Sequence, residues 1–171
     1  MSAQRSMLPD ESTHLAVGKR AQRNIMIAMI TALVAVLAAM SGLNVAQQEM
    51  AIDLGASQSD VLWIINAYTL ALAALLLPIG AIGDRFGRKP VLLAGLAVFA
   101  VATITAFVAT TVPVMIAARV LAGAGAAMIM PVTLSIVTAS FPEEDRAKAI
   151  GVWAGFAGGG SMIGMFVSAL M

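Results

Sequence analysis

The chain has 171 residues, of which 60% are apolar and 11% charged, with a formal net charge of +1 and a mean hydropathy of +0.94. This composition lies far outside that of ordinary soluble domains and indicates an integral membrane protein, whose main partner is the lipid bilayer. The small net charge argues against nucleic-acid binding, and a chain without cysteine has no disulfide framework, no thiolate metal ligand and no cysteine nucleophile.

The N-terminal part divides into a polar arm and a first apolar run. Residues 1–24 carry several cations, and we interpret them as a cytoplasmic tail. Residues 25–46 form an apolar run that is too long for a signal-peptide core, so it predicts an uncleaved membrane span. Residues 47–60 are polar and acidic without any Lys or Arg, and they predict a loop.

Four more apolar runs follow, and they predict spans at about residues 61–83, 91–110, 114–137 and 149–171. Trp63 and Tyr68 near the start of the second run carry rings that are favoured at membrane interfaces. Pro90 suits the first turn of the third helix, where its missing N–H costs nothing. The predicted fold class is an all-α membrane protein with about five transmembrane helices, which form one bundle over residues 25–171.

The distribution of cations predicts the orientation. Nine of the ten Lys and Arg residues lie in the tail and in the loops after the second and fourth spans. The positive-inside rule therefore places the N-terminus in the cytoplasm of a multi-pass protein in the cell (plasma or inner) membrane. An odd number of spans puts the C-terminus outside without a polar flank, and we expect from this that the chain is truncated.

The turn between the second and third spans combines one carboxylate with three cations, so it must lie at a membrane face. Glycines flank these charges and allow a tight turn. One interpretation is that the cations only anchor the topology; the family resemblance described below implies the other, that the turn takes part in gating. The residues concerned are Gly80, Asp84, Arg85, Gly87, Arg88 and Lys89.

Arg119 is the one cation inside a predicted span, about 6 residues or roughly 9 Å from its start. Gly123 and Ala127 follow on the same helix face, so we expect Arg119 to face protein; the alternative is that it snorkels to the headgroups. Depth alone places Asn44 and Asn66 within about one turn of it. We hypothesise a polar cluster there, although each Asn could equally be an interfacial residue or a link between helices.

The fifth span contains two tracks of small residues, which predict two close helix neighbours. One track is Gly151, Gly155 and Gly159, and the other is Gly160, Gly164 and Ser168.

Two of these motifs resemble those of the major facilitator superfamily. The turn matches its cytoplasmic signature G-x-x-x-D-R-x-G-R-K at every fixed position, and residues 119–127 resemble the fourth-helix motif R-x-x-Q-G-x-G-A-A with Ala122 in place of Gln. Asn44 and the segment from Trp63 to Tyr68 resemble the corresponding segments of drug/proton antiporters with fourteen helices. The resemblance covers residues 24–171, and it implies that Asp84 meets the N-terminus of a helix in the second half and closes the cytoplasmic side.

The chain also departs from the antiporter pattern. Ala39 stands where these antiporters usually carry an aspartate, and Met165 replaces the proline of their fifth-helix motif. No Asp, Glu or His lies within the five predicted spans. Three alternatives remain for proton coupling. It could use residues beyond Met171, it could use Arg119 as an electrostatic partner, or it is absent.

Two functional hypotheses follow. The first is the N-terminal part of a proton-coupled exporter of drug-like, cationic or amphipathic small molecules, which would need the missing C-terminal half. The second is a structural or regulatory membrane fragment that associates with another membrane chain. We expect no enzyme activity, cofactor or metal site, because no catalytic pair of residues stands at membrane depth.

Overall fold

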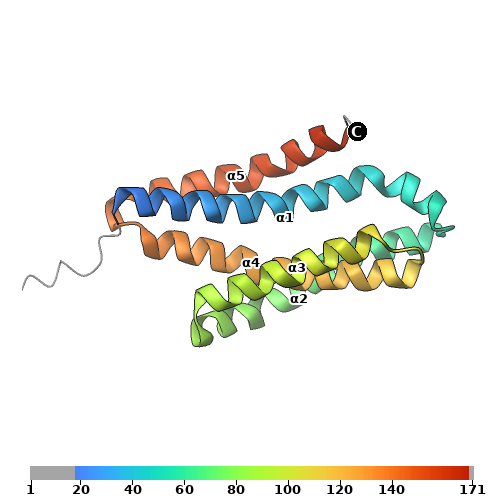
Figure 1. Ribbon diagram of the computed structural model, residues 1–171, viewed down its shortest axis with the longest axis horizontal. Coiled ribbons are helices and arrows are strands. Elements are labelled where there is room, and N and C mark those ends of the chain that lie inside the picture. Colours follow the sequence, from blue (N-terminus) through green and yellow to red (C-terminus); the bar gives the residue numbers. More distant parts are fainter. Residues whose placement is uncertain (1–17, 170–171) are drawn as a thin grey trace, which may run out of the picture.

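The computed structural model describes residues 18–169, and within them it describes all side chains except those of residues 39–51, 84, 160–161 and 163–169 (Figure 1). The described residues form five helices and no strand, which confirms the all-α fold class. The helices are α1 (Lys19–Asp53), α2 (Gln58–Phe86), α3 (Arg88–Phe107), α4 (Val112–Ser140) and α5 (Glu143–Ala169).

The first helix is longer than its predicted span at both ends. It begins at Lys19 and continues to Asp53, so half of the loop predicted over residues 47–60 belongs to this helix. The reason is that polar residues such as Gln and Glu are good helix formers, so a helix need not stop where the hydrocarbon ends. Apolar runs locate the membrane-embedded part of a helix better than its termini.

A tight turn and a capping box make the α1–α2 connection short. Gly55 adopts a positive φ of 59°, which glycine reaches without a steric penalty. The Ser57 hydroxyl accepts a hydrogen bond from the Asp60 amide at 3.3 Å, and Asp60 Oδ2 accepts one from the Ser57 amide at 2.9 Å. This reciprocal pair satisfies two amides at the start of α2.

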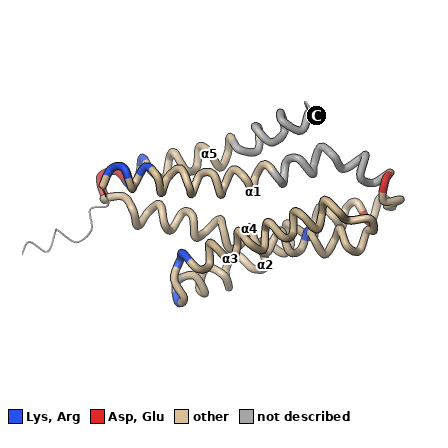
Figure 2. The backbone as a smooth tube through the Cα atoms, in the orientation of Figure 1, with Lys and Arg blue, Asp and Glu red and all other residues tan. Residues whose placement is uncertain are grey.

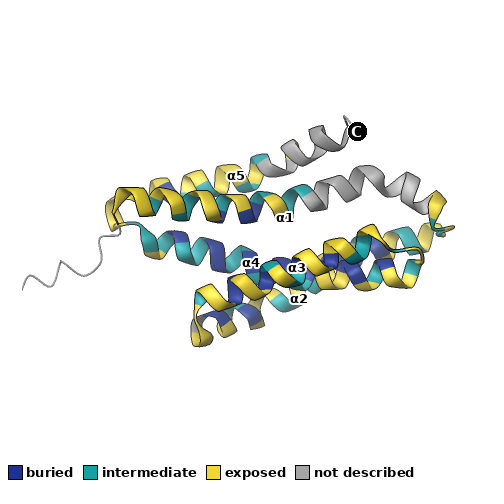
Figure 3. Ribbon diagram, in the orientation of Figure 1, coloured by how far each residue is buried: buried dark blue, intermediate teal, exposed yellow. Residues whose placement is uncertain are grey.

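Helix α4 is the centre of the bundle. It contacts each of the other four helices, with α2 and α3 packed along it as far as Ser135 and α1 and α5, which run side by side, nearer its end (Figure 1). Half of its apolar segment is buried, compared with 22% or 28% for the other three candidate spans. The buried residues gather on α4 and on the faces of α2 and α3 turned toward it (Figure 3).

Small residues let the helix backbones approach α4 closely. A Cβ added to Gly125 would lie 2.8 Å from the Phe99 amide nitrogen, and one added to Gly95 would lie 2.6 Å from Met128 Cβ. Gly123, which the sequence singled out, would direct a Cβ into the Tyr68 carbonyl. Glycine at these positions is therefore required for α2 and α3 to pack on α4.

The glycines of α5 behave differently. Among the residues that the structure describes, no atom lies within 4 Å of a Cβ added to Gly151, Gly155 or Gly159. The close neighbours predicted for this track are thus not supplied by the described residues, because α5 turns another face to α1. Gly160 and Gly164 lie outside the residues whose side chains are described.

The cations gather at one end of the bundle. Lys and Arg mark the start of α1, the α2–α3 turn and the α4–α5 turn, whereas the opposite loops carry only acidic charge (Figure 2). In the part of the chain that the structure describes, four segments are long and apolar enough to cross a membrane: Lys19–Ala38, Gln58–Gly83, Arg88–Phe107 and Val112–Ser140.

Candidate functional site

Arg119 lies between α4 and α2, where it is only 8% exposed. Its Nε–H donates a hydrogen bond to the carbonyl oxygen of Ile64 at 3.3 Å. Its guanidinium carbon stands 4.6 Å from the centroid of the Tyr68 ring, and Tyr68 is fully buried. Arg119 therefore faces protein, and its side chain does not run out to the headgroups.

This arrangement leaves the positive charge only partly compensated. The face of a tyrosine ring attracts a cation, and the Ile64 carbonyl takes one of the five N–H donors of the guanidinium. No ion pair with Arg119 occurs among the described residues, and the buried Tyr68 hydroxyl has no hydrogen-bond partner there. Among the described residues, the guanidinium therefore keeps N–H donors without a partner, and the Tyr68 hydroxyl stands beside them unpaired.

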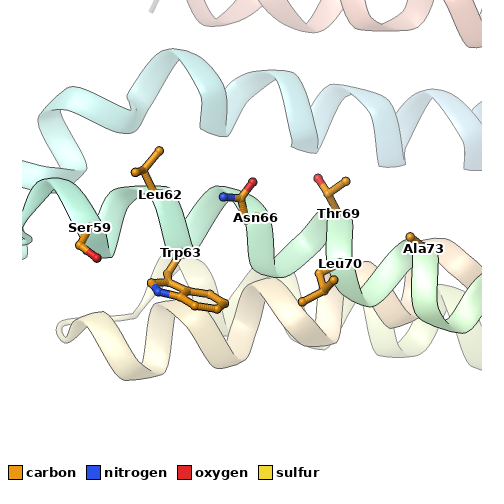
Figure 4. Close-up of a pocket in the computed structure, with 7 residues that line it drawn as sticks. All are labelled: Ser59, Leu62, Trp63, Asn66, Thr69, Leu70 and Ala73. Atoms are coloured by element: carbon orange, nitrogen blue, oxygen red, sulfur yellow. The ribbon is translucent and has the colours of Figure 1, made fainter.

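Asn66 does not join this cluster. It is exposed and lines a pocket of about 480 Å³ on α2, together with Ser59, Leu62, Trp63, Thr69, Leu70 and Ala73 (Figure 4). Asn66 is two residues from both Ile64 and Tyr68, so it points about 200° away from the helix face that holds Arg119. The predicted pairing of Asn66 with Arg119 is wrong, because it used depth in the membrane and not the angle around the helix.

Asn44, the other predicted member of the cluster, lies on α1 outside the residues whose side chains are described. Tyr68, in contrast, was interpreted from the sequence only as an interfacial ring. The signal that could have placed it is its spacing of four from Ile64, which puts both residues on one helix face.

The α2–α3 turn depends on Gly87. Its φ of 94° ends α2 and begins α3, and its amide donates to the Gly83 carbonyl at 3.1 Å. A side chain at a positive φ is strained, so Gly87 sets the geometry of the turn. Gly83 is buried, but its site has room for an alanine side chain, since an added Cβ would lie 3.5 Å from Val132.

Arg88 connects this turn to α4. Its Nη1 donates to the Ser135 carbonyl at 2.9 Å, beside a cavity of about 160 Å³ that Gly80, Gly83 and Pro131 also line. The sequence cannot predict such a contact, because every residue has a main-chain carbonyl.

Neither Arg85 nor Lys89 makes a hydrogen bond or ion pair with another described residue. Arg85 is exposed with its guanidinium carbon 5.6 Å from the Phe86 ring centroid, and Lys89 is exposed as well. The Asp84 side chain lies outside the described residues.

The chain is similar in sequence to a known protein family and to several characterised proteins. Residues 27–171 match the family model of the Major Facilitator Superfamily. The chain is 42% identical over 130 residues to the methyl viologen resistance protein SmvA of Salmonella typhimurium, which covers 75% of this chain and 26% of that protein.

Two other relatives show the same pattern. The methylenomycin A resistance protein of Bacillus subtilis is 39% identical over 75% of this chain and 28% of its own length. The multidrug efflux pump LfrA of Mycolicibacterium smegmatis is 41% identical over 67% of this chain and 23% of its own. The chain thus spans about a quarter of the length of these relatives. The match over most of its residues shows that the chain belongs to the Major Facilitator Superfamily of membrane transporters.

Proposed function

We propose that this chain forms part of the N-terminal half of a carrier that exports drug-like cationic or amphipathic molecules across the cell membrane. The observation that carries the proposal is Arg119, a charge enclosed between α2 and α4 and held there by Tyr68 and Ile64. An ionisable residue inside a membrane bundle is costly, so it usually marks a binding or coupling site. The resistance and efflux functions in the names of the relatives support the class of substrate.

The proposed orientation has the N-terminus in the cytoplasm. The cation-rich end of the bundle would then face inward and the acidic α1–α2 loop outward, as the positive-inside rule requires. The α2–α3 turn would lie at the cytoplasmic face, held against α4 by Arg88.

In this orientation the turn can act as one side of a gate. Because Arg88 and Gly87 fix the turn to this half, a contact made by Asp84 would transmit force to α4. We infer that Asp84 meets the positive end of a helix in a second transmembrane half, where the helix dipole stabilises a carboxylate. That half would lie on the same polypeptide or on another one.

Proton coupling requires a group inside the membrane that can bind and release a proton. The predicted spans carry no acid, so the proton would bind a carboxyl group of the second half, and Arg119 would favour its charged form. Binding of a cationic substrate near Arg119 would also be opposed electrostatically until the arginine finds an anionic partner.

A second candidate function is that of a membrane-embedded subunit that binds another membrane chain without transporting. The observation that favours it is the α5 glycine track, Gly151, Gly155 and Gly159, which no other described helix covers closely. Such a surface fits a helix from another protein.

Growth in the presence of methyl viologen tests the first proposal. Cells that lack their own exporters should be protected by the natural reading frame that contains this chain, and Arg119→Gln should abolish the protection. Arg20→Gln, which removes an exposed arginine at the start of α1, is the matched control and should protect fully. Full protection by Arg119→Gln at equal protein level would refute the role of Arg119, and absence of any protection by the natural frame would favour the second candidate.

A further inference from the structure

A groove of about 340 Å³ lies between the start of α1 and the start of α5. Both helix starts belong to the cation-rich end of the bundle (Figure 2). None of the functions discussed above uses it. Its rim is formed by Lys19 and Arg23 of α1 and by Lys148 of α5, with Asp145 as the one acidic residue that lines it. The charged groups of the groove therefore sum to a positive charge.

The three cations of the rim have no partner within the described chain. Lys19, Arg23 and Lys148 are exposed, and none of them makes a hydrogen bond or ion pair with another described residue. Lys19 and Arg23 are four residues apart, so they stand on one face of α1 and turn the same way. Their charges converge on the mouth of the groove from α1, and Lys148 meets them from α5.

The deeper part of the groove is apolar. Met26 and Ile27 follow the α1 cations by one turn, and Val152 follows Lys148 by one turn on α5. Ile27 is 57% exposed and Val152 is 40% exposed, so the floor offers uncovered apolar surface. The groove thus changes from cationic at the end of the bundle to apolar toward the membrane interior.

The same polarity runs along a phospholipid, from an anionic phosphate to its acyl chains. We propose that the groove binds one anionic glycerophospholipid, with its phosphate among Lys19, Arg23 and Lys148 and an acyl chain along Ile27 and Val152. Basic pockets between transmembrane helices on the cytoplasmic side bind lipid headgroups in this way. A free phosphate would leave the apolar floor uncovered.

The lipid would also link α1 to α5, two helices that few polar contacts join at this end of the bundle. At this end, Gln22 Nε2 donates to the Ser140 carbonyl at 3.2 Å and joins α1 to the end of α4. No such bond joins α1 directly to α5 among the described residues that line the groove. A phosphate shared by α1 and α5 would supply that bond. Its assignment to the inner leaflet rests on the proposed orientation, whereas binding itself does not.

The test is lipid binding by the purified chain in phosphatidylcholine nanodiscs, measured by native mass spectrometry as phosphatidylglycerol is added. We expect one phosphatidylglycerol to bind in preference to phosphatidylcholine. The double variant Arg23→Gln/Lys148→Gln should bind it at least about tenfold more weakly, because each cation near a membrane surface contributes about fivefold. The matched control Arg85→Gln/Lys89→Gln removes the same charge at the same end but outside the groove, and should change affinity less than about twofold.

Each other outcome would overturn the proposal. Equal losses in the two double variants would show a general surface-charge effect, and equal binding of the two lipids would show no anionic site. Competition by glycerol phosphate as strong as that by phosphatidylglycerol would identify a free-anion site. If the double variant fails to fold, Lys148→Gln alone should lower affinity about fivefold, and an unchanged affinity would refute the site. Because binding is measured without transport, failure here leaves the export proposal standing.

Discussion

At the scale of single residues, the pair of Arg119 and Tyr68 organises the interior of the bundle. The sequence identified Arg119 as a buried charge because glycine and alanine follow it on one face of the helix. It could not identify the partner, because depth in the membrane is shared by residues on every face of α2. Asn66 has the right depth but lies on the exposed face of α2, whereas Tyr68 lies on the face that contacts Arg119.

The Tyr68 ring, and not its hydroxyl, should stabilise the protein. Tyr68→Leu removes the cation–π contact and should lower the free energy of unfolding by about 0.5–2 kcal/mol. Tyr68→Phe keeps the ring and removes a buried hydroxyl without a partner, so it should be neutral or slightly stabilising. Thermal unfolding in detergent measures both, with Trp63→Leu on the exposed side of α2 as the control. Equal loss in Tyr68→Phe and Tyr68→Leu would show that the hydroxyl has a partner after all.

Two glycines of the α2–α3 turn should respond differently to substitution. Gly87→Ala places a side chain at a φ of 94° and should destabilise the protein by about 1–2 kcal/mol. Gly80→Ala, inside α2, should cause no loss, since no atom of the described residues lies within 4 Å of the added Cβ. The unfolding temperature of each variant is measured in detergent. An unfolding temperature unchanged in both variants would contradict the geometry at Gly87.

At the scale of helices, the packing of α4 explains why its sequence is rich in Gly and Ala. The sequence predicted the number of helices well, because an apolar run of about 20 residues has few other fates. It predicted helix termini and neighbours less well: α1 continues through polar residues to Asp53, and Gly151, Gly155 and Gly159 have no close neighbour among the described residues. A glycine pattern indicates close packing without naming the partner helix.

The glycines of α4 and α5 should therefore differ in mutational cost. Gly125→Ala forces a Cβ to 2.8 Å from the Phe99 amide nitrogen and should cost about 1–3 kcal/mol. Gly155→Ala meets no atom of the described residues within 4 Å and should leave stability unchanged. Chemical denaturation in mixed micelles compares the two variants. If Gly155→Ala were the more harmful one, α5 would pack against the rest of the chain in another way.

At the scale of the whole molecule, the charges at the two ends define a direction across the membrane. The sequence predicted this arrangement because it depends only on the order of Lys and Arg along the chain. The groove between α1 and α5 could not be predicted, since it joins residues such as Arg23 and Lys148 that are far apart in sequence.

Labelling of single cysteines tests the orientation directly, because the chain has no cysteine of its own. Gln58→Cys, exposed at the start of α2, should react with a membrane-impermeant maleimide added to intact cells. Glu144→Cys, exposed at the start of α5, should react only after the cells are opened. The reverse pattern would place the N-terminus outside and would remove the α2–α3 turn from the cytoplasmic face.

The most direct test of the central claim is proton-driven uptake of methyl viologen into inverted membrane vesicles that contain the natural reading frame of this chain. Export from the cell becomes uptake into such vesicles, so we expect accumulation that collapses when the proton gradient is dissipated. Arg119→Gln should reduce it at least about tenfold, as expected for loss of a charge partner in a site of low dielectric constant. Accumulation by Arg119→Gln equal to that of the natural protein, at equal amounts in the membrane, would contradict the account.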